Sequence, residues 1–441
     1  MVKTVMVLGA GRVARPCVQY ILAKGHRVIA VDLSASRIAK VLQNHPLGTP
    51  VVADAAVEAG ELIRNYRPEV VVCLLPGPFL SEIAEVCVAN GVSMVGATYI
   101  NPRIKALDAQ AREKGLQILC EMGLDPGIDH MSATRMIADL HAAGGQIEGF
   151  WSVCGALPAL ESNTNPLGYK LSWDPESLIG ASLRSAYIME EGEVVLIPDG
   201  EVYQRPVLHE VNGLGWFEIY ANADSRPYVE AYGIPEIRNL FRGTLRYPGW
   251  CDLITQMQKL NLFSTSVEEF AGETYASALC KSIGGDQTVP VDKQVADYLH
   301  LAEFSLAVKK LEWLGLFAET ELPLVRGSWR DIVANAFDEK LQFTTGEKDL
   351  VIMQHRYDVL FPNGKRQRNT STLISLGEVD GDTAIARTTG LPIGIAVDLL
   401  LSGSVQEKGV LTPTSKDIYL PSLQELESLG YGFREEVVTY T

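Results

Sequence analysis

Short apolar runs alternate with amphipathic stretches over the first 120 residues of this 441-residue chain. Runs rich in Val, Ile and Leu, with turn residues on either side, have the length and composition of buried strands. The expected strands are residues 5–8, 27–31, 50–54, 69–75, 93–97 and 116–120. Helical patterns separate them, including residues 34–44, 55–65 and 101–114. A regular alternation of strand and helix predicts a parallel, doubly wound Rossmann sheet, so the fold class is α/β.

The pattern changes after this segment. Residues 123–130 are rich in Gly and Pro and lead into a helix to about residue 142. From 149 to about 247 polar and apolar positions alternate, with frequent turn residues, which predicts a mixed or antiparallel sheet in a second domain. Residues 251–317 are mainly amphipathic and helical, strand-like alternation returns at 349–361 and 368–376, and a helix is expected from 382 to about 401.

The first strand ends in a G-x-G-x-x-A motif at residues 9–14. A strand before it and a helix after it are the setting of a dinucleotide-binding turn. Gly9 would permit the tight turn, Gly11 the close approach of a pyrophosphate, and Ala14 close helix packing. Asp32 ends the second strand, about 20 residues on, where an acid can bind the ribose 2′-hydroxyl. The alternative is an ordinary glycine turn.

The expected cofactor contacts follow the ends of the strands of this sheet. They are Gly9, Gly11, Arg12, Val13, Ala14, Asp32, Leu33, Asp54, Leu75 and Pro76. NAD is the predicted cofactor, because the Asp32 carboxylate would repel the 2′-phosphate of NADP. Arg37, one helical turn further on, could soften that discrimination, so NADP stays open.

Composition narrows the class of protein. The formal net charge of −16 argues against nucleic acid or an anionic membrane surface as a partner. No apolar run reaches the roughly 18 residues of a membrane span, and the N-terminus reads as a strand. The seven cysteines include no C-x-x-C pair, which favours reduced thiols over disulfides or a metal site. We therefore expect a cytoplasmic protein without a metal.

Longer motifs indicate a family. They are E-M-G-L-D-P-G-I-D-H-M from residue 121, C-G-A-L-P-A-L-E-S-N-T-N-P-L-G-Y-K-L-S-W from 154, G-A-T-Y-I-N-P from 96, F-R-G-T-L-R-Y-P-G from 241 and T-T-G-L-P-I-G-I-A from 388. These motifs closely resemble those of the L-glutamate-forming saccharopine dehydrogenases. They follow the same order as in that family and extend over nearly the whole chain.

This resemblance implies both an architecture and an activity. The Rossmann domain would comprise residues 1–122, completed by about 382–441. An inserted α+β substrate domain would take 123–250 and 345–381, and a helical lobe 251–344. The implied reaction is NAD(P)-dependent oxidation of the CH–NH bond of saccharopine, or its reverse, in lysine metabolism. Its products are L-glutamate and 2-aminoadipate 6-semialdehyde, and the cofactor supplies the hydride chemistry.

Three residues fall where this family places active-site groups: Tyr99, Asp125 and Cys154. The structural alternatives are an interface aromatic for Tyr99, a helix cap or Asx turn for Asp125, and a small buried apolar side chain for Cys154. His130 is only a weak candidate base, at the expected helix start. We expect Tyr99 and Asp125 to act in proton transfer or orientation.

The substrate should be held largely by cations, since arginine binds carboxylates bidentately. The expected substrate contacts are Thr98, Pro126, Gly127, Lys170, Ser172, Asn222, Asp224, Arg242 and Arg246. For the two arginines the alternative is a surface salt bridge. One departure matters: the family usually has Asn-Arg-Asp-Ser where this chain has Ala at position 223, and Arg226 could compensate.

Three other functions remain open. A carboxynorspermidine-dehydrogenase-like enzyme would call for acidic pocket residues. A homospermidine-synthase-like transferase would recycle bound NAD rather than release NADH. A non-catalytic regulator would bind the dinucleotide and consume no amine. The expected partner is a small amino-acid substrate, and the sequence leaves a homodimer open.

Overall fold

The computed structural model describes residues 2–172 and 174–440. The chain forms two compact units. The first contains residues 1–148, 229–236 and 353–441, and the second contains 149–228 and 237–352. Residues 123–148 and 353–381, expected in the substrate domain, are grouped here with the dinucleotide-binding segment. The domain boundaries implied by the family resemblance stay a prediction.

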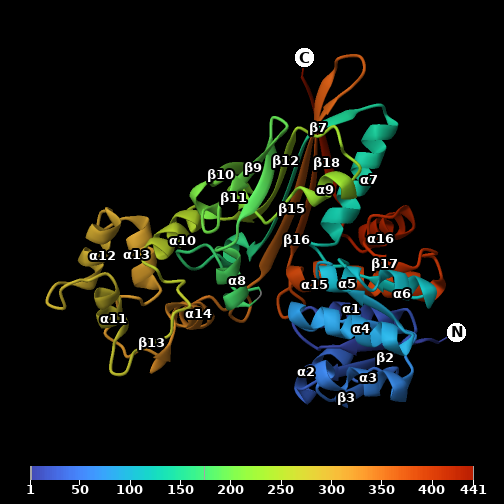
Figure 1. Ribbon diagram of the computed structural model, residues 1–441, viewed down its shortest axis with the longest axis horizontal. Helices are drawn as coiled ribbons and strands as arrows, with labels where there is room; N and C mark the ends of the chain where they lie inside the picture. Colours follow the sequence, from blue (N-terminus) through green and yellow to red (C-terminus); the bar gives the residue numbers. More distant parts are fainter. Residues whose placement is uncertain (1, 173, 441) are drawn as a thin grey trace. The chain divides into compact units, whose positions relative to one another are not determined.

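The first unit is built on a parallel sheet of seven strands, in the order β17-β6-β5-β4-β1-β2-β3 (Figure 1). Their bounds are β1 Thr4–Leu8, β2 Arg27–Asp32, β3 Gly48–Val52, β4 Val70–Cys73, β5 Ser93–Gly96, β6 Gln117–Leu119 and β17 Gly409–Leu411. β1 pairs in parallel with both β2 and β4, so the strand order reverses between β1 and β4. The predicted doubly wound Rossmann sheet is therefore confirmed, with a seventh strand that the sequence pattern did not indicate.

Helices connect these strands. They are α1 Ala14–Ala23, α2 Ala35–Leu42, α3 Ala55–Tyr66, α4 Leu80–Asn90, α5 Pro102–Lys105 and α6 Asp108–Glu113. Apolar side chains of the strands and of α3 and α4 form one continuous core, in which Met6, Leu8 and Val71 have no exposed surface. This core fixes the carboxyl ends of the strands at one edge of the sheet, where ligands bind in such folds.

Helix α15 (Ala384–Ser402) packs along α1. A Cβ added at Gly390 would lie 2.5 Å from the carbonyl oxygen of Val13, so this glycine allows the two helices to approach closely. α15 is also long and apolar enough to cross a membrane by length and composition, and 61% of its apolar window is buried inside the fold. The glycine at position 390 of α15 therefore serves the contact of this helix with α1.

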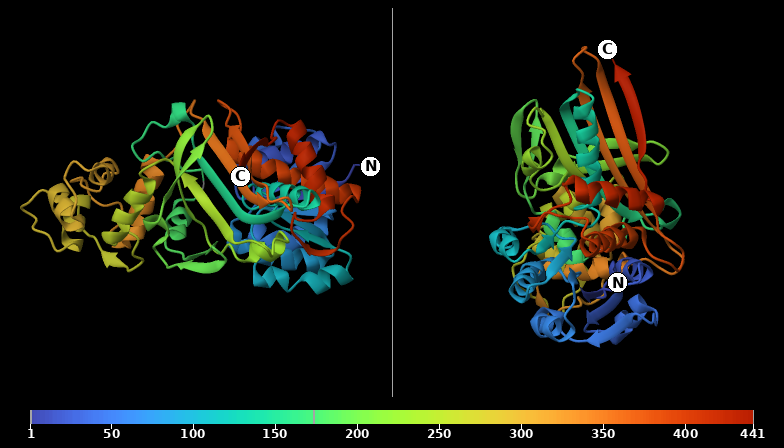
Figure 2. Two further views of the ribbon diagram at one scale, coloured as in Figure 1. Left: turned by 90° about the horizontal axis from the view of Figure 1, so that it is seen from above. Right: turned by 90° about the vertical axis from the view of Figure 1, so that its right-hand side faces the viewer.

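The remainder of the first unit comprises α7 (Ile128–Ala142), α16 (Lys416–Ser428) and the strands β16 (Arg366–Leu376) and β18 (Arg434–Tyr440). β16 and β18 pair antiparallel, and they run side by side in the right-hand view of Figure 2. Two of the four boundaries between the units fall within β7 (Gln146–Pro158) and β15 (Asp349–Leu360), and the other two flank residues 229–236.

The second unit contains a mixed sheet, as predicted. Its other strands are β8 Ala186–Glu190, β9 Glu193–Ile197, β10 Val207–Val211, β11 Gly215–Ala221 and β12 Asn239–Arg246. β10, β11 and β12 pair antiparallel, whereas β12 and β7 pair in parallel. The helices of this unit include α8 Pro175–Ala181, α10 Trp250–Lys259, α11 Tyr275–Ser282, α12 Val291–Leu299, α13 Leu306–Trp313 and α14 Trp329–Lys340. In Figure 1, α11, α12 and α13 gather at one end of this unit.

Candidate active site

The glycine turn after β1 has the geometry of a dinucleotide cradle. Gly9 has φ +99°, and an added Cβ would lie 2.9 Å from the carbonyl oxygen of Leu74, so only glycine fits there. At Gly11 an added Cβ would meet nothing within 4 Å. The turn thus leaves open space beside the start of α1, whose first N–H groups lack helical partners and attract phosphate. These residues fit the pyrophosphate of a nicotinamide dinucleotide.

Asp32 ends β2 and is tied to this turn. Its Oδ2 accepts a 2.8 Å hydrogen bond from the Ala10 N–H, and its Oδ1 accepts one of 2.8 Å from the Ser34 N–H. Arg37 Nη1 lies 4.0 Å from Oδ1. The carboxylate therefore fixes the shape of the turn, a role that the sequence did not reveal. Carboxylate oxygens accept more than one hydrogen bond, so a ribose hydroxyl can still be bound.

The other expected cofactor residues lie beyond the ends of β2, β3 and β4. Leu33 is 72% exposed, and Asp54 caps α3 by accepting a 3.0 Å hydrogen bond from the Ala56 N–H. Leu75 and Pro76 follow β4. Strands of a parallel sheet end at the same edge, so these residues and the glycine turn share one edge of the first unit. Their contacts with a cofactor stay a prediction.

The structure brings Tyr99 and Asp125 together. Tyr99 and its neighbour Thr98 follow the end of β5, and Asp125 lies in the loop between β6 and α7. The Tyr99 hydroxyl donates a 3.0 Å hydrogen bond to Asp125 Oδ1. Tyr99 is 39% exposed, and Asp125 is partly buried, so the pair faces accessible space. A phenol bonded to a carboxylate can hold or move a proton for a bound substrate.

Glycine shapes the loop that carries Asp125. Gly127 has φ +146°, and an added Cβ would lie 2.0 Å from the carbonyl oxygen of Gly123. The Gly123 N–H in turn donates a 2.9 Å hydrogen bond to the carbonyl of Pro126. The loop therefore closes on itself around Pro126 and presents Asp125. Pro126 and Gly127 are buried, and their predicted contact with substrate is untested.

Behind this loop lies a buried cluster that the sequence interpretation missed. His130 is 2% exposed, and its Nε2 lies 3.0 Å from Glu121 Oε2. Its Nδ1 lies 2.7 Å from the Tyr232 hydroxyl. The sequence indicated that His130 stands at a helix start and is a weak candidate base, and it does lie in the first turn of α7. Its partners are 9 residues before it and 102 after it, so no local pattern indicated them.

In the second unit, Cys154 and the two predicted arginines share one face of the sheet. Cys154 on β7 pairs with Thr244 on β12 in the parallel register, so their side chains point the same way. Arg242 and Arg246 lie two positions before and after Thr244 and therefore project to the same side. Arg242 is 5% exposed, and its guanidinium lies 3.9 Å from the ring centroid of Tyr228.

Arg246 is a buried cation suited to receiving an anion. It is 4% exposed and packs over Tyr169, 4.8 Å from the ring centroid. One guanidinium nitrogen donates a 2.9 Å hydrogen bond to the Leu245 carbonyl, whereas Nε has no hydrogen-bond partner within residues 2–172 and 174–440. No salt bridge to Arg246 is formed within the same residues. A buried charge without a counter-ion is costly, and the binding of a substrate carboxylate by Arg246 stays a prediction.

Lys170 and Asn222, two further predicted substrate contacts, already have partners in the protein. Lys170 is 4% exposed and forms an ion pair with Glu347, while Ser172 is partly buried. The Asn222 N–H donates a 2.8 Å hydrogen bond to the Arg242 carbonyl. Their binding of substrate stays a prediction.

Arg226, which could compensate for the alanine at position 223, is paired with Asp224. Its Nε and Nη2 donate hydrogen bonds of 2.9 and 2.7 Å to the two carboxylate oxygens of Asp224. Arg226 also stacks over Tyr187, with 3.8 Å between the guanidinium carbon and the ring centroid. The hydrogen bonds from Arg226 outweigh desolvation and hold the pKa of Asp224 below its usual value. The two charges at this place therefore compensate each other.

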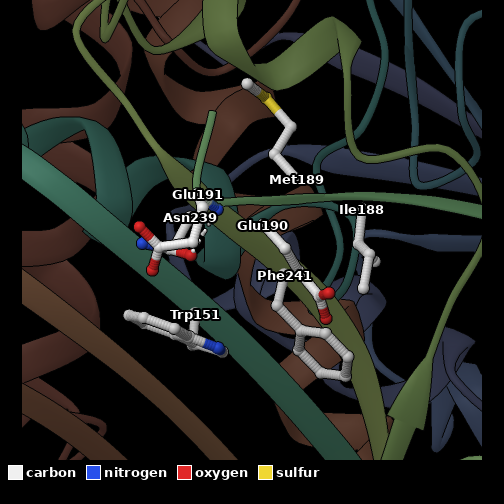
Figure 3. Close-up of a pocket in the computed structure, with 7 residues that line it drawn as sticks. All are labelled: Trp151, Ile188, Met189, Glu190, Glu191, Asn239 and Phe241. Carbon is white, nitrogen blue, oxygen red and sulfur yellow. Dashed lines mark hydrogen bonds between the residues drawn. The ribbon is translucent and has the colours of Figure 1, made fainter. Parts of the chain in front are cut away.

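A pocket of about 310 Å³ lies on the other face of β7 and β12 (Figure 3). Its lining residues are Trp151, Ile188, Met189, Glu190, Glu191, Asn239 and Phe241. Trp151 and Phe241 are direct neighbours in the parallel register, as are Ser152 and Arg242 one position further on. Successive side chains of a strand point to opposite faces, so Phe241 and Arg242 lie on different faces of the sheet. The pocket is therefore separate from the face that carries Cys154 and the arginines. Within the part of the chain that the structure describes, no group of three or more His, Cys, Asp or Glu could hold a metal.

Family models cover most of the chain. Residues 5–119 match the model of the saccharopine dehydrogenase NADP binding domain, and residues 123–431 match that of the saccharopine dehydrogenase C-terminal domain. The junction between the two models, at residues 119–123, falls at the start of the loop that carries Asp125.

Individual relatives match over nearly the full length of this chain. The chain is 32% identical to saccharopine dehydrogenase [NADP(+), L-glutamate-forming] of Pyricularia oryzae, over 99% of each sequence. It is 32% identical to the mitochondrial alpha-aminoadipic semialdehyde synthase of Bos taurus, over 97% of this chain and 47% of that one. Its fold matches apo saccharopine dehydrogenase (L-Glu forming) from Saccharomyces cerevisiae with a TM-score of 0.91, at 27% identity, over 99% of this chain and 100% of that one.

Proposed function

Because this chain belongs to the saccharopine dehydrogenase family, we propose that it is an NAD(P)-dependent oxidoreductase that acts on saccharopine. It oxidises the CH–NH bond of saccharopine, and hydrolysis of the resulting imine releases L-glutamate and 2-aminoadipate 6-semialdehyde. The observation that carries this proposal is the agreement of both family models, in order, over residues 5–119 and 123–431. A nicotinamide dinucleotide, when bound, accepts the hydride.

The residues of the chain have separate tasks in this reaction. Gly9 and Gly11 provide the cradle for the cofactor, beside the start of α1. Asp125, hydrogen-bonded to the Tyr99 hydroxyl, takes the proton from the secondary amine as the CH–NH bond is oxidised, and Tyr99 orients that carboxylate. Arg246, and Arg242 on the same face of β12, bind carboxylates of the substrate. Cys154 lines the arginine-bearing face.

A direct assay tests the proposal. Purified protein is mixed with saccharopine and NAD⁺ or NADP⁺, and the reduced nicotinamide and L-glutamate are measured. We expect one equivalent of each product per saccharopine consumed. Carboxynorspermidine serves as the matched substrate control. This polyamine adduct has fewer carboxylates than saccharopine and would leave the buried Arg246 without a partner. Turnover of carboxynorspermidine but not of saccharopine would contradict the proposal.

We further propose that NAD is preferred over NADP. The support is Asp32, whose carboxylate stands at the end of β2 and is oriented by the Ala10 and Ser34 N–H groups. It accepts a hydrogen bond from a ribose 2′-hydroxyl but repels a 2′-phosphate. The Pyricularia oryzae relative carries NADP(+) in its name, so this preference would set the chain apart from that relative. A higher kcat/KM with NADP⁺ than with NAD⁺ would overturn it.

The homodimer and the cytoplasmic location expected from the sequence stay predictions. Light scattering during size-exclusion chromatography would measure the mass of the particle in solution and so decide the first. Localisation of the tagged chain in its own cell would decide the second.

A further inference from the structure

A buried histidine faces both ends of the loop that carries Asp125. Glu121 begins this loop and Asp129 ends it, in the first turn of α7. His130 Nε2 lies 3.0 Å from Glu121 Oε2, and His130 Nδ1 lies 3.8 Å from Asp129 Oδ2. Glu121, Asp129 and His130 are each at most 9% exposed. One imidazole therefore stands between two carboxylates that are eight residues apart.

Each carboxylate uses its other oxygen to hold backbone next to the proposed catalytic pair. Glu121 Oε1 accepts a 2.9 Å hydrogen bond from the N–H of Ile100, the residue after Tyr99. Asp129 Oδ1 accepts a 2.6 Å hydrogen bond from the Gly127 N–H, two residues after Asp125. The two carboxylates thus reach from His130 to the two segments that present Tyr99 and Asp125.

Glu121 needs such support because its backbone is unfavourable. It has φ +60°, in the left-handed region that non-glycine residues rarely adopt. A residue in this conformation persists when its surroundings hold it in place. The contact with His130 and the hydrogen bond from Ile100 are the side-chain interactions that do so.

A third contact orients the imidazole. The Tyr232 hydroxyl lies 2.7 Å from His130 Nδ1, and the two ring centroids are 5.8 Å apart. Tyr232 is 5% exposed and comes from residues 229–236, a short segment that joins the first unit. Nδ1 faces the phenol, and Nε2 is the ring nitrogen that lies 3.0 Å from Glu121 Oε2.

We propose that His130 is a positioning residue for the reaction. Through Glu121 and Asp129 it keeps the Tyr99 hydroxyl within hydrogen-bonding distance of Asp125. The inference rests on the proposed function, because Tyr99 and Asp125 are its proposed proton-handling pair. His130 itself acts through the two carboxylates and their backbone contacts. Small displacements of a reacting group cost much in rate, so loss of this support should lower kcat more than it raises KM.

Two substitutions of His130 test the contacts of its two ring nitrogens separately. In His130→Gln the amide nitrogen can take the place of Nε2 and donate to Glu121. In His130→Asn the shorter amide can replace only Nδ1, so the contact with Glu121 is lost. We expect His130→Gln to keep kcat within about threefold of the unaltered enzyme, and His130→Asn to lose about tenfold or more with KM nearly unchanged.

His141 offers a matched control on the same helix. It also faces a carboxylate from residues 229–236, with its Nε2 2.6 Å from Glu236 Oε1. It lies near the far end of α7 from Asp125. His141→Asn should lower the melting temperature and leave kcat unchanged. A fall in kcat for both asparagine variants in proportion to their loss of stability would show a merely structural role and overturn the proposal.

A structural readout keeps this test independent of the activity. In a crystal structure of free His130→Asn, we expect the distance from Tyr99 Oη to Asp125 Oδ1 to exceed 3.5 Å, while the same distance in His130→Gln remains near 3.0 Å. An unchanged distance in His130→Asn would overturn the proposal. If the unaltered protein fails to oxidise saccharopine, the proposed function fails, and this distance still decides whether His130 positions the pair.

Discussion

The Tyr99 hydroxyl donates a 3.0 Å hydrogen bond to Asp125 Oδ1, across 26 residues of sequence. The bond joins the segment after β5 to the loop after β6, at the carboxyl edge of the parallel sheet. The same edge carries the glycine turn and Asp32. The proposed proton-handling pair and the glycine turn thus lie at one edge of the same sheet, as transfer of a hydride and a proton from neighbouring atoms would require.

Removing the Tyr99 hydroxyl tests this pair. Tyr99→Phe should fold normally, because the ring is 39% exposed and loses one hydrogen bond. We expect kcat to fall by about 10²-fold, equivalent to about 2.7 kcal/mol in the barrier, since Asp125 loses its orienting donor. Steady-state kinetics with saccharopine measure this. The control is Tyr66→Phe, on the 40% exposed Tyr66 of α3, and a kcat for Tyr99→Phe as high as for that control would refute the role.

We expect Arg246 to strengthen the binding of saccharopine and to lower the free energy of unfolding. Replacing a buried charge that lacks a counter-ion by an apolar side chain of similar length is often neutral or stabilising. Arg246→Met should therefore unfold at the same or a higher urea concentration than the unaltered protein. Its kcat/KM for saccharopine should fall by at least about tenfold, because a hydrogen-bonded charge pair with a carboxylate is lost.

The control for this substitution is Arg238→Met in the same unit. Arg238 has a side chain that is 55% exposed and forms a surface ion pair with Glu191. Such pairs contribute little to stability. Both the urea midpoint and kcat/KM should stay unchanged. A loss of stability in Arg246→Met without a loss of kcat/KM would show that the arginine is structural.

The two glycines of the turn after β1 should respond differently to the same substitution. Gly9→Ala places a Cβ 2.9 Å from the Leu74 carbonyl oxygen at φ +99°, so we expect a loss of about 1–3 kcal/mol in unfolding free energy. Gly11→Ala meets nothing within 4 Å and should leave that free energy unchanged. It should weaken cofactor binding instead, because its methyl group takes space meant for pyrophosphate. Urea unfolding and fluorescence titration with NADH measure the two effects, and unchanged NADH affinity in Gly11→Ala would contradict the cradle.

The ion pair between Lys170 and Glu347 should make the second unit sensitive to acid. Burial alone would raise the pKa of Glu347, but hydrogen bonds from Lys170, Thr344 and Thr164 outweigh it and lower the pKa to about 2. The folded-state pKa lies below the ordinary value of 4.5, so this stabilisation is complete above pH 4.5 and is lost as the pH falls toward 2.

Glu347→Gln isolates this contribution. The unaltered protein should lose up to about 3 kcal/mol more stability than the variant between neutral pH and pH 2. Chemical denaturation at a series of pH values measures the difference. Glu161→Gln is the control, because Glu161 has a lysine partner, Lys348, at the surface. Parallel pH profiles for the unaltered protein and Glu347→Gln would refute the assignment.

Local pattern was sufficient to predict the first six strands of the Rossmann sheet, because each is an apolar run bounded by turn residues. It did not reveal β17, which has only three residues and owes its place to pairing with β6 across the length of the chain. The motifs pointed to Tyr99 and Asp125 as site residues, and the structure joins them. The partners of His130 and Lys170 depend on long-range packing, since Tyr232 and Glu347 lie 102 and 177 residues away. Asp32 was expected to bind the ribose 2′-hydroxyl, and its hydrogen bond from the Ala10 N–H could not be predicted from the sequence.

The pairing of β6 with β17 has a consequence for biosynthesis. Residues 117–119 leave the ribosome about 290 residues before their partner strand at 409–411. At about 5–20 residues per second, the nascent Rossmann sheet keeps an open, apolar edge for roughly 15–60 s. Such an edge is a template for pairing with other chains. We expect chaperones that cover exposed strands to engage this protein during translation, and chains truncated before residue 409 to aggregate rather than accumulate as a smaller folded domain.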